Sequence, residues 1–117
     1  MDNLLSKGKG RTCVNLQMVS MGSDLIVRIY NNNAHIGAVA IGEYDSDHKR
    51  ASVSVVTRLG HKDDAVAQKA AYEISKTTRK TVCVIAGIHL DQITSEEIDQ
   101  LTANSDLLIS ELLNQIE

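Results

Sequence analysis

The sequence predicts a single α+β domain in which two helices cover one face of one sheet. Three observations support this fold class. Four successive segments of the first half have the length and pattern of β-strands, three with alternating apolar and polar residues and one that is apolar on both faces. Helical spacing replaces that alternation twice in the second half, and a short apolar strand lies between the two helices. The expected element order is therefore β-β-β-β-α-β-α, with the four leading strands in an antiparallel meander.

Length and composition restrict the class of protein. A chain of 117 residues suits one domain with a real core, and because it has no Phe, Trp or Pro, that core must consist of Val, Ile, Leu and Ala. A formal net charge of −3 and only three tyrosines argue against nucleic-acid binding through phosphate contacts and base stacking. No stretch has the length and apolarity of a membrane span, and the first ten residues do not resemble a signal peptide. We therefore expect a cytoplasmic protein that binds neither nucleic acid nor membrane.

The strands are expected to begin after a lead-in. Residues 1–10 contain Lys and Gly without any apolar period, and we expect them to be flexible, with the single domain covering residues 11–117. Strand-like alternation follows at residues 11–20, 25–30, 35–42 and 51–57. The third of these strands is apolar on both faces and should therefore be buried on both. Its small side chains would let a helix or a flat ligand approach the backbone closely.

Two segments have helical spacing. The first covers residues 62–76, and a wholly apolar strand at residues 82–87 follows it. The second helix is expected over residues 95–116, because Thr94 and Glu97 have the spacing of a capping box, in which each side chain bonds the backbone N–H of the other residue.

Two of the predicted apolar surfaces are not covered by any predicted element of the same chain. Both helices are expected on the same face of the sheet, which leaves the other face of the strand at residues 35–42 uncovered. Leu107 and Ile109 also widen the apolar stripe of the last helix beyond one face. A homodimer that buries the sheet face or the helix faces would account for these surfaces.

A first polar corner lies at residues 58–64, between a strand and a helix. Gly60 removes side-chain bulk, while Lys62 and a protonated His61 would supply positive charge. The unpaired N–H groups at a helix start also attract anions, so a flavin phosphate would suit this corner. The two aspartates that end the segment support another interpretation, in which acids simply cap the helix. The sequence leaves both interpretations open.

A second polar corner, residues 86–91, follows the apolar strand and contains His89 and Asp91. Together with His61 or His35 they could form a set of two histidines and one carboxylate, but no spacing here is diagnostic of a metal site, and we expect none. Nucleophilic catalysis is not expected either, because both cysteines lie within predicted strands and no serine lies on a Gly-x-Ser-x-Gly turn. General acid–base catalysis by a histidine and an aspartate stays open.

Four short segments resemble a known family. They have the sequences Ala-His-Ile-Gly-Ala-Val-Ala at residues 34–40, Ser-Val-Ser-Val at 52–55, Gly-His-Lys-Asp-Asp at 60–64, and Ala-Gly-Ile-His-Leu-Asp-Gln-Ile-Thr with Glu-Glu-Ile within 86–98. These segments look like the small prenylated-flavin chaperones of the LpdD type, which accompany UbiD-type decarboxylases acting on phenolic acids. The resemblance spans roughly residues 23–117, and the two polar corners are its most specific parts.

The resemblance implies a function and a set of ligand contacts. It implies a non-enzymatic homodimer that binds prenylated FMN, or FMN, and helps to deliver the cofactor to a UbiD-type decarboxylase. The fold of that family is similar to proteasome-assembly-chaperone domains. The residues that it marks as cofactor contacts are His35, Gly60, His61, Lys62, Gly87, His89 and Asp91. Two alternatives remain, a dimeric assembly factor without a small ligand and a small enzyme that uses His89 and Asp91.

Overall fold

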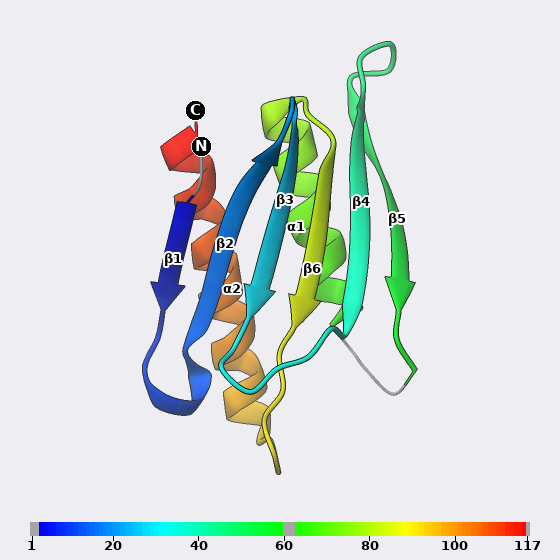
Figure 1. The fold of residues 1–117 in the computed structure, drawn as a ribbon. Coiled ribbons are helices and arrows are strands. Elements are labelled where there is room, and N and C mark those ends of the chain that lie inside the picture. The colour runs from blue at the N-terminus through cyan, green and yellow to red at the C-terminus, as the bar shows by residue number, and fades with distance from the viewer. Residues whose placement is uncertain (1–2, 60–62, 117) are drawn as a thin grey trace.

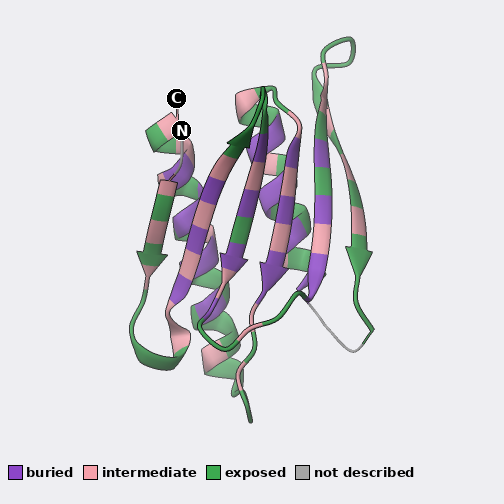
Figure 2. Cartoon of the chain, viewed as in Figure 1, coloured by how far each residue is buried: buried purple, intermediate pink, exposed green. Residues whose placement is uncertain are grey.

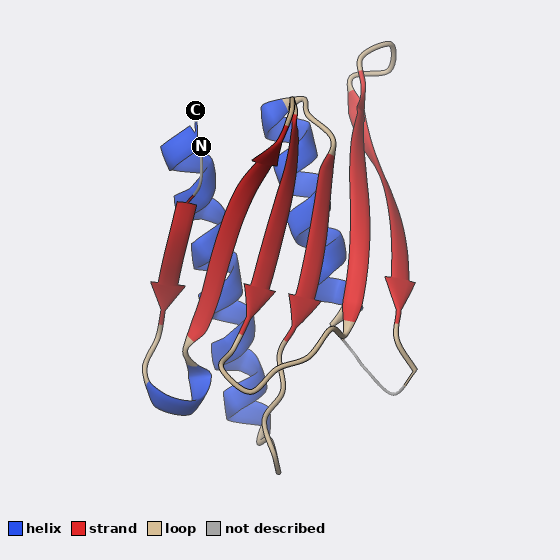
Figure 3. Ribbon diagram, in the orientation of Figure 1, coloured by secondary structure: helices blue, strands red, loops and turns tan. Residues whose placement is uncertain are grey.

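One sheet with two helices behind it makes up the fold (Figure 1). The computed structural model describes residues 3–59 and 63–116. Along the described chain the elements are β1 (Asn3–Lys7), a 3-10 turn η1 (Gly10–Thr12), β2 (Val14–Met21), β3 (Asp24–Tyr30), β4 (Ala38–Asp45), β5 (Arg50–Thr57), α1 (Asp64–Thr78), β6 (Val82–Gly87) and α2 (Ser95–Ile116). The predicted α+β class and the placement of both helices on one face are confirmed (Figure 3).

The strand order is β1-β2-β3-β6-β4-β5. β6 lies between β3 and β4, parallel to the first and antiparallel to the second, while the remaining neighbours are antiparallel. The expected meander is therefore divided into a β2–β3 hairpin and a β4–β5 hairpin. The composition of β6, which has no charged residue, explains its position, because an apolar strand gains most from the interior of a sheet.

The structure places a strand, β1, where the sequence indicated only a lead-in. Asn3–Lys7 pairs antiparallel with β2, in the register Leu5↔Leu16. Leu5 packs against the core, whereas Leu4 is 68% exposed. The strand was missed because only one of its inward positions is apolar, so its five residues show no alternation.

The core lies between the sheet and the helices (Figure 2). Alternate residues of β2, β3, β4 and β6 point toward the helices and are buried. α1 approaches β4 closely at Gly42, because a Cβ atom there would lie 2.5 Å from the carbonyl oxygen of Ala71 and 2.8 Å from Oγ of Ser75. The expectation that small residues in this strand let a helix approach its backbone is thus confirmed.

The opposite face of the sheet, which we call the open face, carries apolar residues that no described element covers. Val39 and Ile41 of β4 point to this face, and Ile41 is 44% exposed. The strand expected to be buried on both faces is therefore buried on one, because both helices pack against the same side. A partner chain on the open face stays a prediction.

The start of α2 confirms the capping box. The backbone N–H of Thr94 donates to Oε1 of Glu97 at 3.1 Å, and the N–H of Glu97 donates to Oγ1 of Thr94 at 3.1 Å. Nε of Arg11 also donates to Oε2 of Glu97 at 2.7 Å and thereby ties η1 to α2. On the same helix Leu107 is 53% exposed, whereas Ile109 is fully buried, so only Leu107 widens the apolar stripe.

Acid is expected to weaken the fold through Glu97. The hydrogen bond from Arg11, followed by the backbone N–H of Thr94, lowers the pKa of Glu97 to about 2 from its ordinary value of 4.5. Because the folded-state pKa is lowered, the stabilisation is complete above pH 4.5 and is lost as the pH falls toward 2. The urea midpoint of Glu97→Gln should therefore change less over this interval than that of the wild type. Glu96→Gln, in the same helical turn, is the matched control, and an equal acid response of Glu97→Gln and the wild type would contradict this role.

Candidate functional site

The segments that carry His35 and His89 meet at the edge of the sheet where β3 and β6 end. These two strands are parallel neighbours, and their last residues, Tyr30 and Gly87, pair with each other. The loop at residues 31–37 leaves β3 and passes beneath the end of β6 to reach β4 (Figure 1). His35 lies in this loop, and its ring centroid is 5.6 Å from that of His89, which follows β6. The tertiary fold thus brings together histidines that are distant in the sequence.

Gly87 is required for the close approach of the loop. A Cβ atom at this position would overlap the carbonyl oxygen of His35 and lie 2.9 Å from its carbonyl carbon. The backbone N–H of Gly37 donates to the carbonyl oxygen of Ala86 at 2.9 Å, and Arg58 donates to the carbonyl oxygen of Ile36 at 2.8 Å. The loop that carries His35 is therefore bound to β6 on one side and to the residue after β5 on the other.

Asn31 fixes the segment that carries His89. Its Nδ2 donates to the carbonyl oxygen of His89 at 2.7 Å, and its Oδ1 accepts the backbone N–H of the same residue at 3.1 Å. The side chain is only 6% exposed, so both of its polar ends have partners where water is excluded. The sequence pattern marked Asn31 only as part of a turn, and this double contact was not predicted.

A hollow of about 310 Å³ opens on the open face beside these loops. Its walls combine an aromatic ring, a guanidinium group, amides, a histidine and aliphatic side chains. The lining residues are Arg28, Tyr30, Asn31, Asn32, Ala34, His35, Ile36, Ile85 and Gly87. Two of the residues predicted as cofactor contacts, His35 and Gly87, belong to this lining.

Arg28 and Tyr30 are lining residues that the sequence did not assign to the site. The guanidinium carbon of Arg28 lies 4.7 Å from the centroid of the Tyr30 ring. The available signal was that both residues share one face of a strand that ends in three asparagines. It was insufficient because the hollow depends on β6, whose position beside β3 has no local signature.

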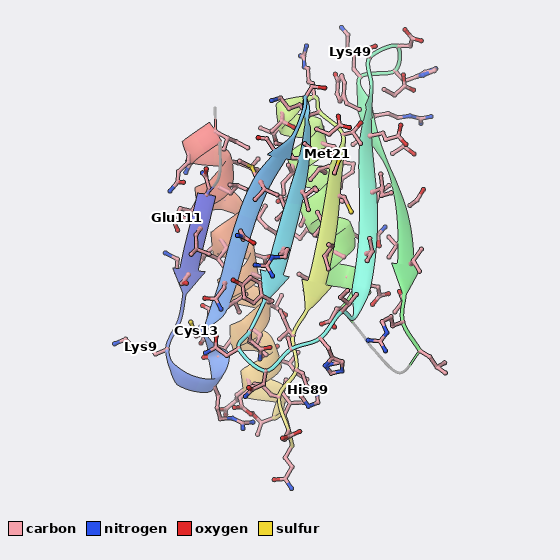
Figure 4. All side chains as sticks on the ribbon, in the orientation of Figure 1. Lys9, Cys13, Met21, Lys49, His89 and Glu111 are labelled. Atoms are coloured by element: carbon pink, nitrogen blue, oxygen red, sulfur yellow. The ribbon has the colours of Figure 1, made fainter. Side chains whose placement is uncertain are left out.

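Two other predicted residues lie in an adjoining hollow of about 280 Å³. His89 and Asp91 line it together with Arg11 and Cys13, among others, and it shares two asparagines with the first hollow. Nε2 of His89 is 2.9 Å from Oδ1 of Asp91 (His89 is labelled in Figure 4). The side chain of Asp91 is 91% exposed, so this pair lies in water rather than in an enclosed pocket.

The remaining predicted contacts, Gly60, His61 and Lys62, lie outside the described residues. Their neighbour Asp63 is described and nearly buried. A Cβ atom at Gly37 would overlap the carboxylate of Asp63, so this aspartate packs directly against the loop that carries His35. The start of α1 therefore adjoins the loop that carries His35, while the pairing of the two polar corners stays a prediction.

Within residues 3–59 and 63–116, no three His, Cys, Asp or Glu side chains are grouped so that they could hold a metal ion. Neither of the helices in this part of the chain combines the length and apolarity needed to cross a membrane.

Comparison with known proteins decides the family. A family model described as the prenylated flavin chaperone LpdD-like domain matches residues 8–117. The chain belongs to this family. The resemblance seen in four short segments is thereby confirmed, and it covers nearly the whole of the LpdD-like chain. None of the curated proteins matches.

The fold of the LpdD-like chain also occurs among solved structures. A chain from the crystal structure of a novel chaperone complex for yeast 20S proteasome assembly is similar to it, with a TM-score of 0.62 and 13% sequence identity. The match covers 98% of this chain and 94% of that chain. At this identity the likeness concerns the fold alone, and it confirms the expected similarity to proteasome-assembly chaperones.

Proposed function

We propose that this LpdD-like protein is a non-enzymatic chaperone that binds prenylated FMN and assists the maturation of a UbiD-type decarboxylase. The observation that carries the proposal is the hollow between Arg28, Tyr30 and His35, in a chain that belongs to a family of prenylated flavin chaperone domains. The pair formed by His89 and Asp91 gives less support to an enzyme, because general acid–base catalysis is favoured by a site that excludes water.

The lining of the hollow suits a flavin. A flavin nucleotide joins a flat, polar-edged ring to an anionic phosphate. Tyr30 and the aliphatic side chains offer surface for a ring, the asparagine amides lie beside it, and Arg28 offers positive charge. A volume of about 310 Å³ is at the lower end of ligand pockets, so the hollow would hold one part of the cofactor while the rest extends over the open face.

The residues marked by the family resemblance are the proposed contacts. His35 would contact the cofactor from the wall of the hollow. Gly87 would act indirectly, because it lets the loop that carries His35 pack closely against β6. His89 and Asp91 would complete the rim from the adjoining hollow. Gly60, His61 and Lys62 are proposed contacts on the strength of the resemblance alone, because they lie outside the described residues.

A homodimer is proposed because the open face is apolar beyond the hollow. Val39, Ile41, Ile85 and Val56 lie on this face, and Val56 is among the exposed large apolar residues. A second copy stacked there would exclude water from the sheet and from a cofactor bound beside it. The same surface would also suit an assembly factor without a small ligand, which is the second candidate function.

Titration of the purified protein with FMN and with prenylated FMN tests the proposal. We expect saturable binding of prenylated FMN, measured by absorbance or calorimetry, and sedimentation velocity of the same sample should give a species of twice the chain mass. The double substitution His61→Ala and Lys62→Ala should weaken flavin binding and leave binding to the decarboxylase intact. No binding of either flavin at tens of micromolar protein, with a partner protein still bound, would favour the assembly factor instead.

A further inference from the structure

Arg28 is an isolated charge on the open face. Across the sheet it lies in a row with Gln17 of β2, Ile85 of β6, Val39 of β4 and Val56 of β5. None of these neighbours is charged. Within the strands, the two flanking rows on the same face are also without charge, since they hold Asn15, Tyr30 and Gly87 on one side and Val19, Ile26, Cys83, Ile41 and Ser54 on the other. Arg58 follows β5, and its guanidinium group donates to the carbonyl oxygen of Ile36.

The guanidinium group of Arg28 is positioned but not neutralised. Its Nε donates to Oε1 of Gln17 at 2.6 Å, and the group lies over the ring of Tyr30. By contrast, Arg11 forms an ion pair with Glu97. Among the described residues, Arg28 has no carboxylate partner, and its two terminal amino groups have no hydrogen-bond acceptor.

A guanidinium group held in this way is suited to binding an anion. Its two amino groups form a planar fork that matches the oxygens of a phosphate. The bond to Gln17 and the stacking on Tyr30 reduce the freedom that Arg28 would lose on binding. The side chain also lines the hollow proposed for the flavin, so the anion and the ring would be bound side by side.

We infer that Arg28 binds the phosphate of the flavin, so that the phosphate lies over the open face of the sheet and the ring lies toward Tyr30 and His35. This inference rests on the proposed function and changes where the anion is placed. The sequence had suggested the start of α1, but Asp63 and Asp64 already stand there and would repel a phosphate.

Comparison of FMN with riboflavin, which lacks the phosphate, tests the assignment. The wild type is expected to bind FMN about tenfold or more tightly than riboflavin, because hydrogen bonds to charged groups are among the stronger ones. Arg28→Gln should lower the affinity for FMN by about the same factor and change the affinity for riboflavin by about twofold at most. Arg28→Lys, which keeps the charge without the fork, should retain part of the preference.

Two further variants localise the effect. Arg50→Gln removes an arginine at the opposite end of the sheet and should keep the wild-type ratio of the two affinities. Lys62→Gln should also keep the ratio, whether or not it weakens both flavins. The melting temperature of each variant, measured without ligand, verifies that the fold is intact.

The outcomes separate this inference from the proposed function. Failure of the wild type to bind FMN, riboflavin and prenylated FMN removes both the inference and the proposed function. Binding of both flavins without a preference for FMN overturns the role of Arg28 alone, and so does an equal loss for both flavins in Arg28→Gln. If the ratio of the FMN and riboflavin affinities is lost in Lys62→Gln and kept in Arg28→Gln, the phosphate lies at the start of α1. The proposed chaperone function is not affected by that outcome.

Discussion

Replacing Gly42 with valine is expected to lower the free energy of unfolding by about 2 to 3 kcal/mol. α1 lies directly on β4 at this residue, where a Cβ atom would be 2.5 Å from the backbone oxygen of Ala71. The obstacle is helix backbone rather than the end of a flexible side chain, so the helix itself must move away. Because α1 is buried along this contact, the displacement would open gaps beside Ala40 and Ser75.

Urea denaturation followed by circular dichroism measures this effect. Ser54→Val is the matched control, since it introduces the same side chain at an exposed position of the neighbouring strand. The control should unfold within about 0.5 kcal/mol of the wild type. A Gly42→Val protein with the wild-type midpoint would show that α1 does not pack on β4 as closely as described.

Replacing Gly87 with alanine is expected to reduce flavin affinity by more than about tenfold, which corresponds to about 1.4 kcal/mol of binding free energy. The added methyl group would overlap the carbonyl oxygen of His35 and force the loop at residues 31–37 away from β6. That loop carries His35 and Ile36 into the wall of the hollow. Displacing it changes the shape of the proposed site, and small displacements of contacts are costly in a preorganised pocket.

Gly42→Ala is the control for this second prediction. It adds the same methyl group to a glycine on the other face of the sheet, so it should reduce stability and leave flavin affinity unchanged. Titration with FMN and a thermal melt of both variants test this difference. Gly87→Ala should show the opposite pattern, a large loss of affinity for FMN with a smaller loss of stability. Wild-type affinity in Gly87→Ala would mean that the position of the His35 loop does not matter to the ligand.

Features with a local cause could be predicted from the sequence. The start of α2 was predicted correctly because Thr94 and Glu97 bond each other across three residues. The strands at residues 14–30 were visible because one of their faces is buried and the other is not. The close contact of α1 with β4 followed from glycine and alanine at successive inward positions.

Features that depend on distant pairing could not be predicted. β1 has little apolar character and forms because the edge of β2 is available to it. The insertion of β6 between β3 and β4 brings residues more than fifty positions apart into register, and no local pattern encodes such a register. The contacts made by Asn31 and the isolation of Arg28 both follow from that insertion, so the sequence could suggest the histidines of the site but not their surroundings.

The position of β6 also determines when the site can exist. Tyr30 and Gly87 border the hollow from adjacent parallel strands, and the chain between them forms the β4–β5 hairpin and α1. The hollow is therefore absent until the last strand has entered the gap between the two hairpins. Non-local pairing of this kind is a slow step in folding, because the entropy of closing a long loop must be overcome first. A cofactor that binds there would meet only chains in which β6 is already in place, and a chain that stops short of β6 would have no cavity to offer it.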